Sequence, residues 1–184
     1  IPSSRVWDGV ERALRHHAKV LIQTPDLDSY RNHLLWGAMG VAIGNDLGSR
    51  PSAITLDLPW HPFFRLPMPT TEAFFDTMPG APDYGDCVIP GPHQAIATFD
   101  RLPYPGNGAI ITNFATTFVI NALKLSNTAD ADTDGIPDAL ELLVNEILAL
   151  KPCNDVEWLD EEPTAETLPG HASQVITVTF DATH

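Results

Sequence analysis

An acidic run of twelve residues, 130–141, constrains this chain more than any other segment, and it reads DADTDGIPDALE. Side-chain oxygens recur at positions 1, 3, 5, 9 and 12 of the run, and a glycine, which permits a sharp bend, stands at position 6. This spacing is typical of a loop that wraps Ca²⁺, a hard cation that takes about six to eight oxygen ligands. Without a cation the carboxylates would repel one another. The sequence therefore predicts a calcium loop whose ligands are the side chains of Asp130, Asp132, Asp134, Asp138 and Glu141 and the carbonyl of Ile136.

A solvated acidic turn is the competing interpretation, because Asp is favoured in turns and at helix caps. A helix predicted over 139–150 follows where a calcium loop needs one. Pro137 takes position 8, where a regulatory EF-hand usually has an apolar residue that pairs with a second loop, and the sequence contains no second loop. The run resembles the Asp-rich loops of thrombospondin type 3 and dockerin-like repeats, which implies a structural rather than a signalling ion. Five apolar residues of the following helix are expected to face the core: Leu140, Leu143, Val144, Ile147 and Leu148.

The charge balance excludes some partners. The chain has 10 basic and 24 acidic residues, a formal charge of −14. Such a surface repels phosphate backbones and anionic lipid, so we expect no nucleic-acid partner. No apolar run approaches the roughly 20 residues that a bilayer span needs, so we expect no membrane span.

Two cysteines, Cys87 and Cys153, bear on the compartment. A calcium loop of this type suggests millimolar calcium outside the cytoplasm, and together with the cysteines it favours an oxidising compartment and a Cys87–Cys153 disulfide, worth roughly 4 kcal/mol. Two buried thiols are the alternative. The first residue, Ile1, fits a mature chain after signal removal as well as a trimmed chain. Because no N-x-[ST] sequon occurs, we expect a secreted, periplasmic or cell-surface protein of bacterial origin.

The predicted fold class is α+β: one domain, 1–184, with two N-terminal helices, a few short antiparallel strands, long ordered irregular segments and an EF-hand-like calcium loop followed by a helix. Apolar residues recur with a helical period over 4–23 and 28–43, which predicts an antiparallel helical hairpin over 4–44. The other predicted parts are a proline-rich strand and coil region, 51–108, the calcium loop and helix, 130–150, and a C-terminal strand, 172–181.

Two segments of the proline-rich region, 54–58 and 94–100, alternate like strands. Residues 109–125 fit both periods. Their β-branched content favours a strand, whereas a helix would lead well into the calcium loop. We expect a helix in the second half.

The seven histidines are the remaining candidates for chemistry, since no H-E-x-x-H, G-x-S-x-G, P-loop or paired CxxC motif occurs and we expect no enzyme. His61 and His93 each stand beside prolines that fix the backbone. Two such imidazoles could meet around one transition metal, and Cu⁺ suits two histidines best because it tolerates low coordination. The alternative is that each histidine bonds to backbone within its loop.

The proline-rich centre, the calcium loop 130–141 and the segment 58–64, in which Trp60 adjoins His61, together resemble the surface-associated copper proteins of methane-oxidising bacteria, the CorA/MopE family. In that family we expect one residue to stand between the Trp and the first His, whereas here the two are adjacent. The resemblance implies a Cu⁺ site with His61 and His93 as ligands and Trp60 oxidised to kynurenine as the third ligand, and a di-haem peroxidase-like partner that carries out the oxidation. His33 with Trp36 is the alternative pair, because residues three apart on a helix share a face.

Three functions remain open from the sequence. One is a secreted copper(I)-binding protein, for copper acquisition or storage, in which calcium is structural. Another is a calcium-stabilised extracellular binding or structural module without a transition metal. The third is a secreted enzyme that uses a histidine near calcium, which rests on the number of histidines alone.

Overall fold

The computed structural model describes residues 4–48, 53–70, 74–75, 85–100, 105–125, 129–150, 159–162 and 177–180. The chain divides into two compact units, Ile1–Leu150 and Lys151–His184. The second unit contains a two-stranded antiparallel sheet of β8 (Leu159–Glu162) and β9 (Thr177–Phe180). The first unit carries all the candidate sites described below.

A seven-stranded mixed sheet forms the first unit, with strand order β1-β7-β6-β4-β2, while β5 pairs with β6 and with β3. β1 runs parallel to β7, with Val20 opposite Phe118, and the other pairs are antiparallel. The strands are β1 (Val20–Gln23), β2 (Ala42–Asp46), β3 (Ile54–Leu56), β4 (Asp86–Ile89), β5 (Gln94–Phe99), β6 (Gly108–Thr112) and β7 (Phe118–Asn121).

The helical elements of this unit are short apart from α1 and α4. They are α1 (Ser4–Arg15), the 3-10 turn η1 (Asp28–Tyr30), α2 (Leu34–Met39), the 3-10 turn η2 (Pro62–Phe64) and α4 (Asp138–Leu150). Among the described helices, none is both long enough and apolar enough to cross a bilayer.

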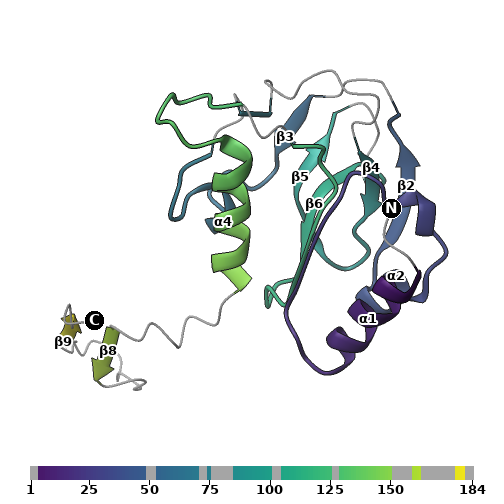
Figure 1. Ribbon diagram of the computed structural model, residues 1–184, viewed down its shortest axis with the longest axis horizontal. Helices are drawn as coiled ribbons and strands as arrows, with labels where there is room; N and C mark the ends of the chain where they lie inside the picture. The colour runs from purple at the N-terminus through teal and green to yellow at the C-terminus, as the bar shows by residue number, and fades with distance from the viewer. Residues whose placement is uncertain are drawn as a thin grey trace, which may run out of the picture. The chain divides into compact units, whose positions relative to one another are not determined.

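The sheet carries a hydrophobic core on each face. Ile110 and Val119 belong to one core, whereas their strand neighbours Ile111 and Ile120 belong to the other. Because successive side chains of a strand point to opposite faces, the two cores lie on opposite sides of the sheet. Figure 1 shows α4 on one side of β5 and β6, and α1 and α2 on the other.

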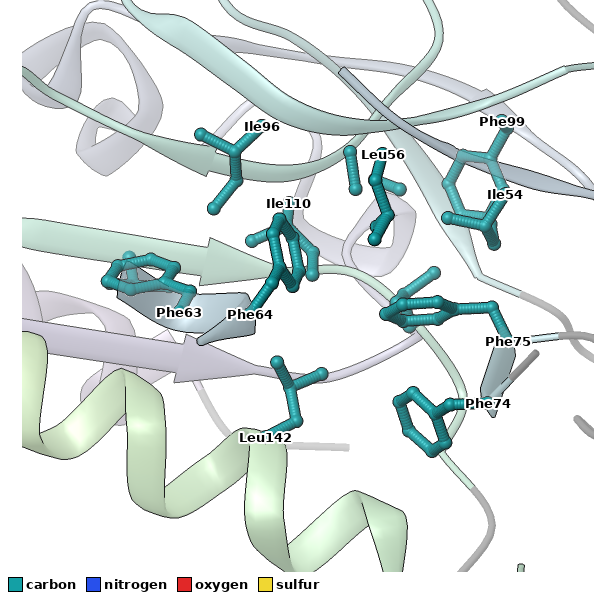
Figure 2. Close-up of a cluster of buried hydrophobic side chains, with 14 of the residues drawn as sticks. Ile54, Leu56, Phe63, Phe64, Phe74, Phe75, Ile96, Phe99, Ile110 and Leu142 are labelled. Carbon is teal, nitrogen blue, oxygen red and sulfur yellow. The ribbon is translucent and has the colours of Figure 1, made fainter. Parts of the chain in front are cut away.

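Aromatic residues of the proline-rich region fill the core beneath α4 (Figure 2). Phe63 and Phe64 come from η2 and are fully buried, and Phe75 meets the ring of Phe64 edge-on with centroids 6.3 Å apart. Leu142 of α4 is also fully buried in this core. Burial of several Phe side chains, each worth about 1.5–3 kcal/mol, gives the irregular segment a packing role.

The expected helical hairpin over 4–44 is wrong. α1 ends at Arg15, and the segment that was expected to continue the first helix forms β1. α2 has only six residues, and Gly40, with φ of 73°, ends it before β2 begins. The physical reason is that β-branched Val20 and Ile22 pair with β7 and are buried there, which a surface helix would not achieve.

The expected few antiparallel strands are also wrong, because the described sheet has seven strands and mixed direction. Within 109–125, the second half is strand β7 rather than a helix. The fold remains broadly α+β. The strands expected near 54–58 and 94–100 are present as β3 and β5.

The helix after the acidic run is present as α4, but the wrong face was expected to be buried. Leu140, Ile147 and Leu148 are 49%, 46% and 43% exposed. The buried face is instead largely polar and consists of Asp138, Glu141, Leu142, Asn145, Glu146 and Leu150. Polar residues can occupy that face because most of them find specific partners there.

Candidate metal centre

Five carboxylates converge in the acidic loop (residues 130–141), which precedes and opens α4. One oxygen from each of Asp130, Asp132 and Asp138 lies within 4.8 Å of the others, and the same holds for Asp132, Asp134 and Glu141. Asp132 belongs to both groups. The structure therefore brings together all five carboxylates that the sequence predicted as ligands.

The backbone of the acidic loop turns by means of its own side chains. Asp130 Oδ2 accepts from the Gly135 N–H at 3.0 Å, and Asp134 Oδ1 accepts from the Ile136 N–H at 2.7 Å. Gly135 has a φ of 95°, a conformation that favours glycine, so the sharp bend falls at position 6 as predicted. These bonds fix Asp130 and Asp134 to the backbone of the turn, while Asp132 and Asp134 remain exposed.

The last two carboxylates lie on the first turn of α4 and are almost completely buried. Asp138 is 3% exposed and Glu141 is 2% exposed. Asp138 accepts from the Ala131 N–H at 3.0 and 3.2 Å, which closes the loop back onto its beginning. Burial, and then the neighbouring aspartates, raise the pKa of Asp138 and raise that of Glu141 to about 7.

This negative charge lacks compensation among the described residues. The ion pairs found there, Arg15 with Glu11 and His33 with Asp8, do not involve the acidic loop. Asp130 Oδ1 is buried and has no hydrogen-bond donor within the described part of the chain. An all-oxygen group of this kind can hold a hard divalent cation, which would neutralise the repulsion and use the unpaired oxygen.

Ile136, the predicted carbonyl ligand, lies inside the same turn and is partly buried. Its N–H is already engaged by Asp134, so its backbone orientation is fixed by the loop.

The structure does not bring the predicted copper ligands together. The partly exposed His61 ring packs edge-on against Phe63, a residue of the core beneath α4, with centroids 4.4 Å apart. The partly exposed His93 ring packs edge-on against Phe118, a residue of the core on the opposite face, with centroids 5.1 Å apart. Among the described residues, the groups of three or more metal-ligating side chains consist only of carboxylates.

Each of these histidines bonds to backbone. His61 Nδ1 accepts from the Phe63 N–H at 3.4 Å and caps η2, and burial lowers the pKa of His61. His93 Nε2 lies 2.6 Å from the Met39 carbonyl oxygen. Trp60, the proposed kynurenine, is 68% exposed.

The alternative pair is also engaged elsewhere. His33 Nδ1 accepts from the Leu35 N–H and caps α2, while its Nε2 lies 3.2 Å from Asp8. The Trp36 indole N–H donates to the Tyr30 carbonyl at 2.9 Å.

Cys87 is fully buried in β4 and forms no disulfide among the described residues. Burial raises the pKa of its thiol to about 12. Cys153, its predicted partner, lies outside the described residues, so the disulfide stays a prediction.

Sequence reasoning missed two further buried carboxylates. Asp86 accepts from the N–H groups of Leu27 and Asp28, which ties β4 to η1, and burial raises its pKa to about 6. Asp26, Asp28 and Asp86 also form an acidic group, but the backbone donors already satisfy its buried member. Glu146 is fully buried and accepts from Asn121 Nδ2 at 2.8 Å. In the sequence, the available signal for the burial of Asp86 and of Glu146 was a carboxylate followed by apolar residues.

No protein-family model, curated protein or solved structure matches this chain. The comparisons therefore assign it to no family, and the resemblance to the copper proteins stays a prediction.

Proposed function

We propose that the first unit is a calcium-stabilised extracellular binding or structural module, in which the acidic loop holds one Ca²⁺. The observation that carries the proposal is the burial of Asp138 and Glu141, 3% and 2% exposed, against three further aspartates without a cationic side chain among the described residues. Buried carboxylates of like charge need either protons or a cation to remain together.

Two features favour a cation over protons. Asp130 Oδ1 is buried without a donor, and a protonated neighbour would be expected to donate to it. Hydrogen bonds from the Gly135 and Ile136 N–H groups also hold Asp130 and Asp134 in place. Within each group of three carboxylates, one oxygen of each lies within 4.8 Å of the others, which is close enough to share an ion.

The donor set favours Ca²⁺ among the common ions. All the candidate metal ligands are oxygens, whereas Cu⁺ and Zn²⁺ prefer sites with nitrogen or sulfur ligands. Five carboxylates and a carbonyl approach the six to eight ligands, roughly, that Ca²⁺ takes, whereas Mg²⁺ keeps several waters and is bound through one or two carboxylates.

The ion would act by joining the loop to α4. Glu141 reaches the loop from the first turn of this helix, and Leu142, the next residue, is fully buried against the core beneath α4. Calcium at the loop would therefore stabilise the docking of α4 on the sheet. This is a structural role, consistent with a loop that stands alone in the sequence.

The copper function stays a prediction without a supporting contact, since His61 and His93 pack against phenylalanines of different cores and both bond to backbone. Metal analysis of the natively purified protein tests the copper function separately from calcium. An intact mass tests for the ring-opened tryptophan that a di-haem partner would produce.

Thermal unfolding in calcium and in a chelator tests the calcium proposal. At a hundredfold excess over the Kd, the ion adds about 2.7 kcal/mol, which raises the Tm by about 5–10 °C for a chain of this size. Asp132→Asn, at the residue common to both carboxylate groups, should lose most of that rise, as should Glu141→Gln.

The matched control is Asp57→Asn, which removes an exposed carboxylate outside the loop and should keep the full calcium response. Equal melting temperatures in calcium and in chelator, for a wild-type protein that is folded in both, would rule the proposal out.

A further inference from the structure

A cavity of about 390 Å³ lies on the face of the sheet opposite α4, away from the acidic loop. Four separate segments build it: the end of α1, the end of α2, the turn between β4 and β5, and the turn between β6 and β7. Its volume lies within the range of roughly 300–1,000 Å³ that small-molecule sites occupy. The lining residues used below are Leu14, Arg15, Met39, His93, Thr117 and Phe118.

The imidazole of His93 is fixed in the wall of this cavity. A carbonyl oxygen can only accept, so His93 Nε2 donates its N–H to Met39 O, at 2.6 Å. The β4–β5 turn approaches α2 closely, because a Cβ on Gly91 would lie 2.1 Å from the Gly40 carbonyl oxygen and one on Gly40 would lie 2.9 Å from the His93 ring. Both glycines are required for the imidazole to sit there.

A hydroxyl of the β6–β7 turn is held in a similar way. Thr117 Oγ1 accepts from Asn113 Nδ2 at 2.7 Å, and Asn113 Oδ1 accepts from the Thr117 N–H at 2.8 Å. Because Oγ1 is used as an acceptor, its own hydrogen is available to donate. The β6–β7 turn thus presents an ordered O–H donor.

Arg15 supplies positive charge to the lining. Residues 11–19 read ERALRHHAK, and Glu11, the one acid of this run, forms an ion pair with Arg15 at 2.7 Å. Arg15 contacts Glu11 through Nε and Nη2. Its Nη1 has no partner among the described residues, so the N–H groups of Nη1 can donate to a ligand. No Asp or Glu is among the described residues that line the cavity. A cationic side chain in a lining without a described carboxylate favours an anionic ligand over a neutral one.

The rest of the lining is apolar. Leu14, Met39 and Phe118 contribute to the wall, and Met39 and Phe118 are themselves buried. Polar and apolar groups share the lining about equally, so the cavity offers a small organic molecule both a hydrophobic surface and fixed polar groups.

We propose that this cavity binds a small organic carboxylate with a short aliphatic or aromatic body: Arg15 and Thr117 take the carboxylate and the apolar wall takes the body. None of the residues involved belongs to the acidic loop, so the inference does not depend on calcium binding.

Two-dimensional ¹H–¹⁵N NMR titrations of the whole chain in calcium-containing buffer test the proposal. The probes are phenylacetate and hexanoate, with phenylacetamide and acetate as the comparisons that lack the charge or the body. We expect saturable shifts confined to Leu14–Arg15, Ala38–Met39, His93 and Thr117–Phe118, and at least about fivefold tighter binding of one of the two larger acids than of either comparison.

Arg15→Gln should weaken binding of that acid by about fivefold, because it removes the charged donor of the cavity. Arg12→Gln is the matched control: it removes an exposed charge from the same helix outside the cavity, and it should change the affinity less than about twofold.

The absence of saturable shifts with both larger acids would overturn the proposal. Equal binding of phenylacetate and phenylacetamide would overturn its assignment to carboxylates, and equal losses in the two arginine variants would reduce Arg15 to a general surface charge. Because calcium is present throughout, these outcomes are distinct from a failure of the calcium loop.

Discussion

At the scale of single residues, α1 ends in an unusual way. The N–H of Ala18 bonds to the Ala13 carbonyl and the N–H of His17 to that of Leu14, both at 3.0 Å, which is the pattern of a Schellman motif. The left-handed position of this motif normally takes glycine, but here His17 takes it, with φ of 63°. The side chain therefore adds conformational strain that glycine would remove.

We predict that His17→Gly stabilises the protein by up to about 1 kcal/mol, since it relieves the left-handed backbone. His16→Gly is the control, because His16 is the adjacent residue with the same side chain and lacks a positive φ. Urea denaturation should give a higher midpoint for His17→Gly than for wild type and a lower one for His16→Gly. A lower midpoint for both would contradict the interpretation.

Glu146 gives the pH dependence of stability a specific source. Burial raises its pKa to about 8 from 4.5, and its Oε2 has no partner among the described residues. Between these two values the folded state keeps the proton that the unfolded state releases. This carboxyl therefore favours folding least at high pH, and its contribution to stability falls as pH rises from about 4.5 to about 8.

Glu146→Gln should remove this slope, because the amide stays neutral at every pH. The free energy of unfolding of wild type, measured by urea denaturation from pH 5 to pH 8, should fall relative to that of the variant by up to about 1.4 kcal/mol per pH unit. If the free energies of unfolding of wild type and variant changed in parallel with pH, Glu146 would have the same protonation state in the folded and unfolded protein, and the prediction would be wrong.

At the scale of elements, α4 is anchored through its polar face. Asn145 donates to the carbonyls of Phe63 and Met68 at 3.0 and 2.6 Å and accepts from the Met68 N–H at 3.2 Å. One side chain thus satisfies three backbone groups of the segment that carries η2. The apolar residues of the other face, such as Ile147, remain about half exposed.

Asn145→Ala should cost about 2–3 kcal/mol, since it leaves those backbone groups unpaired in a buried site. Ile147→Ala, on the exposed face, should cost less than about 1 kcal/mol. Chemical denaturation of both variants measures the difference. If Ile147→Ala were the more damaging, the apolar face of α4 would have to be covered in solution.

The elements also show which parts of the fold the sequence could predict. β3 and β5 alternate clearly and were expected, whereas Val20–Gln23 has only four residues and fits a helical stripe equally well. Its state is decided by parallel pairing with β7, about a hundred residues away, which no local pattern reports. For α4 the period was correct but the face was wrong, because the partners of Asn145 and Glu146 lie in distant segments.

At the scale of the whole molecule, the two candidate sites differ in how far sequence reasoning can reach. The acidic loop is contiguous, so its spacing in the sequence is nearly its geometry in space, and all five of its predicted carboxylates converge. The cavity combines four segments between residues 14 and 118, and its key groups, a histidine fixed by Met39 and a threonine fixed by Asn113, carry no motif. His93 was singled out in the sequence for the prolines near it, and the structure gives it a different setting.

The net charge is also a property of the whole chain. One bound Ca²⁺ changes the formal charge of −14 by two units, to −12. The larger effect is local, because the ion would lie among five carboxylates at the point where the loop meets α4.

The most direct test of calcium binding is isothermal titration of Ca²⁺ into the chelator-treated chain, with Asp132→Asn as the comparison. The account predicts one bound ion per wild-type chain and little or no binding by the variant. Failure of the folded wild-type chain to bind calcium, or an equal affinity in Asp132→Asn, would contradict it.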